Sequence, residues 1–574
     1  MASISTDVGG LDVRRTGRGL PRVSWGTALC VVILLVVGAA VLFPLFLIVR
    51  QSFDVSKPGE AARFGLDGWA AIFSERGLRT AVNNTLLLSI TRQAIALPIA
   101  IGIAWLIART DLPGSRWFEF GFWLSFFLPT LTVTLSWILV LDPDYGLFNQ
   151  LIRPTGLHFN IYSFWGIVWT HLVAHNISVM VMLLTPAFRN MNSSFEEASR
   201  VAGASTLSTI WRIFVPVMMP AILAVELIVL MRSLESFEVE QILGPPISFQ
   251  VMATWIYATF YQQTPRIDAA SALAVVLVAC MLLFVVIQQR FIGKRRYTTV
   301  TGQFQGQIFR LGAARVPALV FMGIIMFLIM GVPFVFATMG TFMKLFGYFT
   351  NDPWTLQHWQ TAFREPLLLR SLQNTLILAT ATAAASVLLN SLIAYVIVRT
   401  RFFGRHALDF ITWLPFTVPG ILLSLGLLTM FLLPPLRPIY GSIYVLILAG
   451  VISGMPLAVQ ITKSNLMQLG AELEEASWLT GGSWWHTYRR VVLPLLRPTL
   501  VVVALISFIG AARNVAQVAL LSNAQNRPLS MLQLDYMAEG KFEVAAVVAC
   551  CILFLTVGLA LVARAFGYRA GAGG

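Results

Sequence analysis

Long apolar runs separated by short polar segments follow one another along the whole chain. Runs long enough to cross a membrane fall near 24–50, 82–108, 117–141, 162–187, 217–243 and 268–292, and then near 314–339, 371–398, 408–433, 439–463, 495–520 and 542–566. A helix needs about 20 apolar residues to cross the hydrocarbon core of a bilayer. The pattern therefore predicts an all-α polytopic membrane protein with two parallel sets of six helices, about 12 transmembrane helices in total.

Composition excludes the common soluble classes. Of the 574 residues, 57% are hydrophobic and only 11% are charged, whereas soluble domains carry about 25% charged residues. The polar residues are scattered among short connections, so they predict no separate soluble catalytic domain. The four cysteines all lie inside apolar runs, which indicates small buried side chains and neither disulfides nor a metal site.

The charges orient the predicted helices. The chain has 40 Lys and Arg against 26 Asp and Glu, a formal net charge of +14. Basic residues gather in the N-terminal tail, in the 290–315 connection and in the loops after the second and eighth runs. The positive-inside rule places these segments, and so both termini, in the cytoplasm. This topological role explains the excess charge better than nucleic-acid binding does, because no basic-aromatic module lies outside the apolar runs.

The two sets of runs are repeats of one another. The tripeptide Asn84-Thr85-Leu86 recurs as Asn374-Thr375-Leu376, an offset of 290, and a longer match around 196–216 recurs at 474–494, an offset of 278. Since each repeat has an even number of spans, the copies share one orientation and are related by an axis along the membrane normal. We therefore divide the chain into a cytoplasmic tail (1–23), a first membrane domain (24–292), a cytoplasmic linker (293–313), a second membrane domain (314–566) and a C-terminal tail (567–574).

A duplicated cytoplasmic loop between the fourth and fifth spans of each half is the most informative feature. We call each copy a coupling elbow and expect a short helix, a turn and a second helix. The glycine of each copy is placed where a left-handed residue ends the first helix, Ser205 and Ser483 are placed to cap the second, and the proline closes the unit before the chain re-enters the membrane. The key residues are Glu197, Ala198, Gly203 and Pro216 in the first elbow, and Glu475, Ala476, Gly481 and Pro494 in the second.

This pattern resembles the E-A-A-x-x-x-G-x9-I-x-L-P signature of permeases from binding-protein-dependent ABC importers. Ser199 and Ser477 replace the third residue of the signature, and Val215 and Val491 replace Leu and Ile. The resemblance covers essentially the whole chain as two fused type I permease domains. It implies a multi-pass protein of the bacterial inner membrane that interacts with membrane lipid and not with nucleic acid. It also implies a homodimeric ABC ATPase on the cytoplasmic face and a solute-binding protein outside.

Missing motifs fit this interpretation. No G-x-x-x-x-G-K-[ST] phosphate-binding loop occurs, since Gly293-Lys294 precedes Arg295 and Gly540-Lys541 precedes Phe542. We therefore expect a transport subunit and not an enzyme, with no cofactor of its own and with ATP and Mg bound by the partner ATPase. An ion-coupled secondary transporter is the alternative class, although it would need no docking elbow. A membrane enzyme is disfavoured because no H-E-x-x-H or G-x-S-x-G motif appears.

The substrate is indicated only by softer patterns. Fusion of two six-span domains resembles the importer group for ferric iron, thiamine and related solutes. The stretches Asp352–Trp359, Leu243–Pro246 and Pro528–Gly540 look like the iron-type members of that group. We therefore expect iron(III), with thiamine, a polyamine, a phosphonate or another small solute as alternatives.

Ionisable residues inside the predicted spans are candidates for the translocation path, because they are costly in a membrane. Glu235 in the fifth span aligns with Arg513 in the eleventh at the 278 offset. We hypothesise that the two form an ion pair across the pseudo-symmetry axis, with a structural salt bridge or interfacial helix ends as the alternative. His171 and His175 lie four residues apart on one helical face. Without a nearby carboxylate they make a poor ferric site, so we expect polar packing and include only His175 as a path candidate.

Overall fold

A computed structural model of the protein describes residues 25–56, 61–191, 202–203, 205–260, 265–293, 308–349 and 352–565. Within these ranges nine helices are long and apolar enough to cross a membrane, and three further helix pairs bring the total to 12 if each bent pair is one span. The described residues form no β-strand and only isolated β-bridges. The predicted all-α fold with about 12 transmembrane helices is confirmed.

The first half consists of six spans and several short helices. Its helices are α1 (Trp25–Gln51), α2 (Asp67–Ser74), α3 (Arg76–Arg109), α4 (Ser115–Ser125), α5 (Thr130–Leu141), α6 (Leu147–Ile152), α7 (Phe164–His171), the π-helix η2 (Leu172–Asn176), α8 (Ile177–Arg189), α10 (Thr206–Thr209), the π-helix η3 (Ile210–Phe214), α11 (Val215–Leu234), α12 (Glu238–Leu243), α13 (Met252–Thr259) and α14 (Ile267–Gly293). The helices α3, α8 and α11 pack against one another and form the centre of this half.

The second half repeats this order. Its helices are α15 (Arg315–Met326), the π-helix η6 (Phe327–Gly331), α16 (Val332–Phe342), α17 (Gln357–Arg364), α18 (Pro366–Arg399), α19 (Arg405–Trp413), the 3-10 helix η7 (Leu414–Thr417), α20 (Gly420–Phe431), α21 (Ile443–Gln468), α22 (Glu472–Leu479), α23 (Trp484–Thr487), the π-helix η9 (Tyr488–Val492), α24 (Leu493–Leu495), α25 (Arg497–Arg513), α26 (Leu529–Ala538), α27 (Phe542–Leu553), the π-helix η10 (Phe554–Gly558) and α28 (Leu559–Ala565). The helices α18, α21 and α25 pack together as α3, α8 and α11 do.

Several expected spans are not continuous helices. The run 117–141 bends by 104° between α4 and α5, and the run 408–433 bends by 112° between η7 and α20. Pro129 and Pro419 stand at these two breaks in extended conformations, because proline lacks the N–H that a continuing helix requires. The fifth run breaks after Leu234, and the eleventh ends at Arg513 instead of near residue 520. These breaks correct the continuous spans expected from hydropathy.

The first span of each half packs against the other half. The helix α1 lies against α19 and α20, while α15 and α16 lie against α4 and α5. Close approach at glycines supports both contacts: a side chain on Gly426 would meet Pro44 and Ile48, and one on Gly121 would meet Met326. The two halves are therefore interlocked, because the first span of each half packs against helices of the other.

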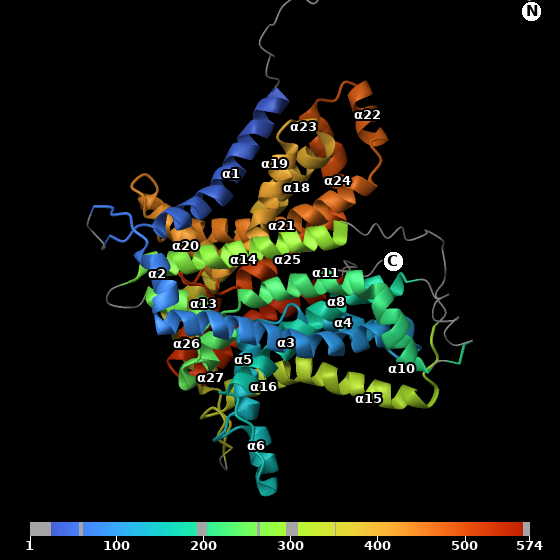
Figure 1. Cartoon of the computed structure of the whole chain (residues 1–574), viewed down its shortest axis with the longest axis vertical. Helices are drawn as coiled ribbons and strands as arrows, with labels where there is room; N and C mark the ends of the chain where they lie inside the picture. The colour runs from blue at the N-terminus through green and yellow to red at the C-terminus, as the bar shows by residue number, and fades with distance from the viewer. Residues whose placement is uncertain are drawn as a thin grey trace, which may run out of the picture.

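The Asn-Thr-Leu repeat forms equivalent contacts in both halves. Thr85 accepts a hydrogen bond from the backbone N–H of Met252 at 2.9 Å, and Thr375 accepts one from Leu529 at 2.7 Å. Met252 and Leu529 are the first residues of α13 and α26. Each threonine therefore satisfies an otherwise free N–H at a helix start. Figure 1 places α2, α13 and α26 on the left of the molecule and α10 and α22 on the right.

Candidate translocation pathway and coupling elbows

The second coupling elbow has the geometry that its sequence predicts. The helix α22 ends before Gly481, which adopts the left-handed conformation with φ of +84°. The hydroxyl of Ser483 then accepts a hydrogen bond from the N–H of His486 at 3.2 Å and caps α23. The chain continues through the π-helix η9 to Pro494 and bends by 77° before α25. The predicted helix, turn and second helix are present in this copy.

An acidic side chain fastens this elbow to the transmembrane helix α18. Glu474, which is 4% exposed, forms a 2.8 Å ion pair with Arg399 and accepts a 2.9 Å hydrogen bond from Tyr395. Arg399 also donates to the backbone carbonyls of Leu466 and Leu469. The Arg399 guanidinium thereby joins the end of α18 to the end of α21 and the start of α22. Sequence reasoning named Glu475 and passed over Glu474, although the same motif contains both.

The outward surface of the second elbow is apolar and exposed. Glu475 and Ala476 are exposed, as the docking prediction requires. Beside them, Leu479 is 88% exposed, and Trp478 and Trp485 are about half exposed. Large apolar side chains gathered on an exposed surface are typical of interaction sites.

The first elbow is described only in part. Glu197 and Ala198 lie outside the described residues. Gly203 has a φ of +78°, and the hydroxyl of Ser205 accepts a hydrogen bond from the N–H of Ser208, as in the second copy. Pro216 does not close the unit as expected, because the helix runs on from Thr206 to Leu234 through the π-helix η3. In both copies a π-helix ends two residues before the proline. The wider π turn accommodates the missing proline N–H.

A cavity of about 530 Å³ lies between the two halves. Its walls come from α3, the break between α4 and α5, the η2 region, the end of α11, and from α21 and α25 of the second half. All three path candidates, His175, Glu235 and Arg513, line it. One wall follows α21 through Leu457 and Ile461 toward the end that joins the second elbow.

Arg513 lines this cavity and bridges the two halves. It donates hydrogen bonds to the backbone carbonyls of Phe126 and Leu128 at the break between α4 and α5, the latter at 3.1 Å. Its guanidinium also lies 5.0 Å from the centre of the Phe126 ring and 3.2 Å from His175 Nε2. Because α25 begins beside the second elbow and ends at Arg513, this contact lies at the end of the cavity remote from that elbow.

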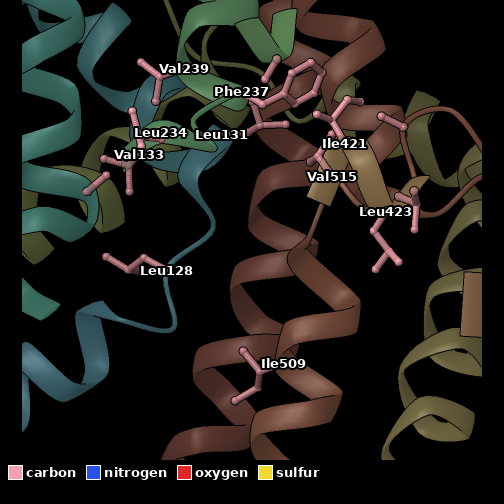
Figure 2. Packing of buried hydrophobic residues seen from close by; sticks show 14 of the residues in the cluster. Leu128, Leu131, Val133, Leu234, Phe237, Val239, Ile421, Leu423, Ile509 and Val515 are labelled. Carbon is pink, nitrogen blue, oxygen red and sulfur yellow. The ribbon is translucent and has the colours of Figure 1, made fainter. Parts of the chain in front are cut away.

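The opposite half supplies a related contact. The Arg232 guanidinium lies 4.6 Å from the centre of the Phe416 ring, and Phe416 corresponds to Phe126 at the 290 offset. Each half therefore places an arginine from its fifth span over an aromatic ring at the bend of the other half. We call these the two Arg–Phe clasps. Figure 2 shows apolar side chains of both halves near these breaks, including Leu128, Leu234 and Phe237 of the first half and Val515 of the second.

The hypothesised Glu235–Arg513 ion pair is wrong. Glu235 binds Arg232, three residues earlier on the same helix, at 2.6 Å. Arg513 instead binds backbone carbonyls, and the backbone N–H of Val515 donates to Glu238 at 3.3 Å. Alignment by the offset located both residues on the cavity wall. It did not predict the break after Leu234, which turns Glu235 back toward its own helix.

The two histidines have different partners. His171 Nε2 lies 2.8 Å from Glu240 Oε1, so the expectation that no carboxylate lies nearby is wrong. Glu240 comes from α12, which packs against α7. Among the described residues no group of three or more His, Cys, Asp and Glu side chains is placed to hold a metal ion.

Comparison with known proteins agrees with these features. The family model described as "Binding-protein-dependent transport system inner membrane component" matches residues 96–297 and again 386–570. The chain is 32% identical over 413 residues to a ferric transport system permease protein FbpB of Actinobacillus pleuropneumoniae, and 34% identical over 378 residues to a putative ferric transport system permease protein FbpB 1 of Haemophilus influenzae. These alignments cover 70% and 64% of this chain but only 58% of each relative.

A second Haemophilus influenzae protein, Fe(3+)-transport system permease protein FbpB 2, is 20% identical over 91% of this chain and 95% of its own length. The two family matches fall in the two structural repeats, and together they cover more than half of the chain. The multiple apolar helices agree with a multi-pass protein of the inner membrane. The chain belongs to the family of binding-protein-dependent transport system inner membrane components, as a fused permease with two copies of the family domain.

Proposed function

We propose that this chain is the permease of an ATP-driven importer that carries iron(III) into the cytoplasm. The observation that carries the proposal is the combination of two coupling elbows, which share the left-handed glycine and the serine cap, with a cavity between the halves. The relatives named above are ferric transport permeases, which favours iron as the solute. Thiamine, a polyamine, a phosphonate or another small solute remains the alternative cargo.

We infer that the elbows dock two ATPase subunits on the cytoplasmic side, which also holds both termini. The exposed apolar surface around Leu479 and Trp485 supports docking to a protein groove. Glu474 and Arg399 would carry a displacement of the elbow to α18 and α21, because one ion pair joins all three elements. ATP and Mg would bind the partner ATPase, which supplies the energy of transport.

The clasps suggest how the path opens. In the present conformation Arg513 holds the two halves together at the end remote from the second elbow. Closure of an ATPase dimer would bring the elbows together and separate the clasps. The cavity would then face the external binding protein, and solute would enter. Discrete rearrangement of two packed halves is the usual form of such transitions.

The test is reconstitution. The permease, its ATPase and the binding protein encoded beside it are placed in proteoliposomes, and uptake of ⁵⁵Fe is measured with and without ATP. We expect uptake that requires ATP and the iron-loaded binding protein. Iron uptake driven by an ion gradient without ATPase would identify a secondary transporter instead. ATP-dependent uptake of labelled thiamine, polyamine or phosphonate, without iron, would reassign the cargo.

A further inference from the structure

Arg92 presents a buried guanidinium to the cavity, and no hydrogen bond joins it to any part of the chain that the structure describes. The residue lies on α3, is 3% exposed and lines the cavity. Its Nε atom is buried and unpaired. Buried polar groups in proteins are normally hydrogen-bonded, and each exception requires an explanation. In a membrane-spanning segment the cost of such a group is higher still, so an ionisable residue there is a candidate functional site.

The other charged groups of the cavity wall are already engaged. Arg232 binds Glu235, Arg513 binds the carbonyls of Phe126 and Leu128, and Glu238 accepts from Val515. The buried side-chain atoms of the described cavity wall that lack a partner are Arg92 Nε and Asn176 Nδ2. Both atoms are hydrogen-bond donors. The cavity is therefore suited to a solute that accepts hydrogen bonds from these two donors.

Two carboxylates stabilise Arg92 without occupying its donors. Glu240 and Glu235 lie close enough to Arg92 to attract it electrostatically. Glu240 directs one oxygen to His171 and Ser236, and its other oxygen has no partner. The negative charge nearby lowers the cost of burying the guanidinium. The N–H groups of Arg92 remain available to a solute in the cavity.

We propose that this cavity binds an oxyanion through Arg92 and Asn176, and that ferric ion crosses as a complex with that oxyanion. Phosphate, carbonate and carboxylate chelators share the chemistry, because guanidinium groups bind planar and tetrahedral oxyanions in the same way. Three arginines and two glutamates, Glu235 and Glu238, line the cavity. An anionic iron complex would present oxygen atoms to the unpaired donors of Arg92 and Asn176, which a bare cation cannot do. This inference rests on the proposed import of iron(III).

Double-label transport tests the inference. Binding protein loaded with ⁵⁵Fe and either ³²P-phosphate, ¹⁴C-citrate or ¹⁴C-bicarbonate is supplied to proteoliposomes that contain the complete transporter. We expect one of the three anion labels to enter with iron and in proportion to it. Entry of ⁵⁵Fe at the wild-type rate without any of these labels would overturn the oxyanion complex. Absence of ATP-dependent iron uptake would instead refute the proposed function, and equilibrium dialysis of the permease in nanodiscs against each anion would still decide the site.

Variants at position 92 test whether entry of the labelled anion depends on Arg92. Arg92→Gln should lower iron and anion entry together by about tenfold or more, since charge-assisted hydrogen bonds are lost, and should abolish saturable anion binding in nanodiscs. Arg92→Lys keeps the charge and should retain part of both. The matched control is Thr382→Val, at the equivalent position of the second half, which should leave both unchanged. Normal anion binding in a folded Arg92→Gln permease would overturn the assignment.

Discussion

The clasp at Arg513 gives a quantitative prediction about gating. Arg513→Met keeps the length of the side chain but removes the guanidinium, and with it the hydrogen bonds to Phe126 and Leu128. A hydrogen bond to a charged group contributes about 1.5–3 kcal/mol, and the carbonyls can bind water once the halves separate. The variant should therefore favour separation of the halves by about 2–3 kcal/mol, or about 30- to 150-fold in the opening equilibrium.

The corresponding change in the other clasp is the control. Arg232 is half exposed and already paired with Glu235 on its own helix, so only its contact with the Phe416 ring crosses the interface. An exposed cation–π contact contributes about 0.5–1 kcal/mol. Arg232→Met should therefore shift the same equilibrium only about two- to fivefold.

Opening can be measured by thiol labelling. Ala516 lines the cavity three residues beyond Arg513 and lies close to Gly420 of the other broken span. An Ala516→Cys permease, with the four native cysteines replaced, is exposed to a membrane-impermeant maleimide from outside. The labelling rate should rise strongly with Arg513→Met and weakly with Arg232→Met. Equal rates in both, or no increase with Arg513→Met, would refute the gating role.

Three further changes test the second elbow and the helix α26. Gly481→Val should weaken copurification of the ATPase, because a β-branched residue at a φ of +84° costs about 1–3 kcal/mol, whereas Gly481→Asn, which tolerates this conformation, should retain it. Glu474→Gln leaves Arg399 without its ion pair and should increase tryptic cleavage of the elbow; unchanged digestion would contradict the anchoring role. Burial raises the pKa of Asp535 to about 6, so the folded protein binds this proton more tightly than the unfolded chain. Lowering the pH from 7.5 to 5 should therefore stabilise wild type relative to Asp535→Asn by about 1.4 kcal/mol in thermal unfolding, and a constant difference would refute it.

Hydrophobic periodicity and motif spacing predicted the two sets of spans and the glycine turns of the two coupling elbows. The glycine turns at Gly203 and Gly481 follow from local backbone rules, because glycine adopts the left-handed conformation that commonly ends a helix. Hydropathy located the spans but could not show the bends at Pro129 and Pro419, since apolar residues continue through both. The partners of Glu235 and His171 also escaped prediction. They depend on how α11 and α12 separate, which is a tertiary arrangement and leaves no period in the sequence.

The differences between the halves give a physical reason for their fusion. Both halves keep the same scaffold, as the threonines at 85 and 375 and the two elbows show. They differ at the cavity: Arg92 and His171 line it, whereas the equivalent positions of the second half, Thr382 and Ala449, do not. Two identical subunits would place two copies of Arg92 around one low-dielectric cavity, where like charges repel strongly. A single chain with two divergent repeats keeps the shared scaffold and places the Arg92 guanidinium on one side of the cavity.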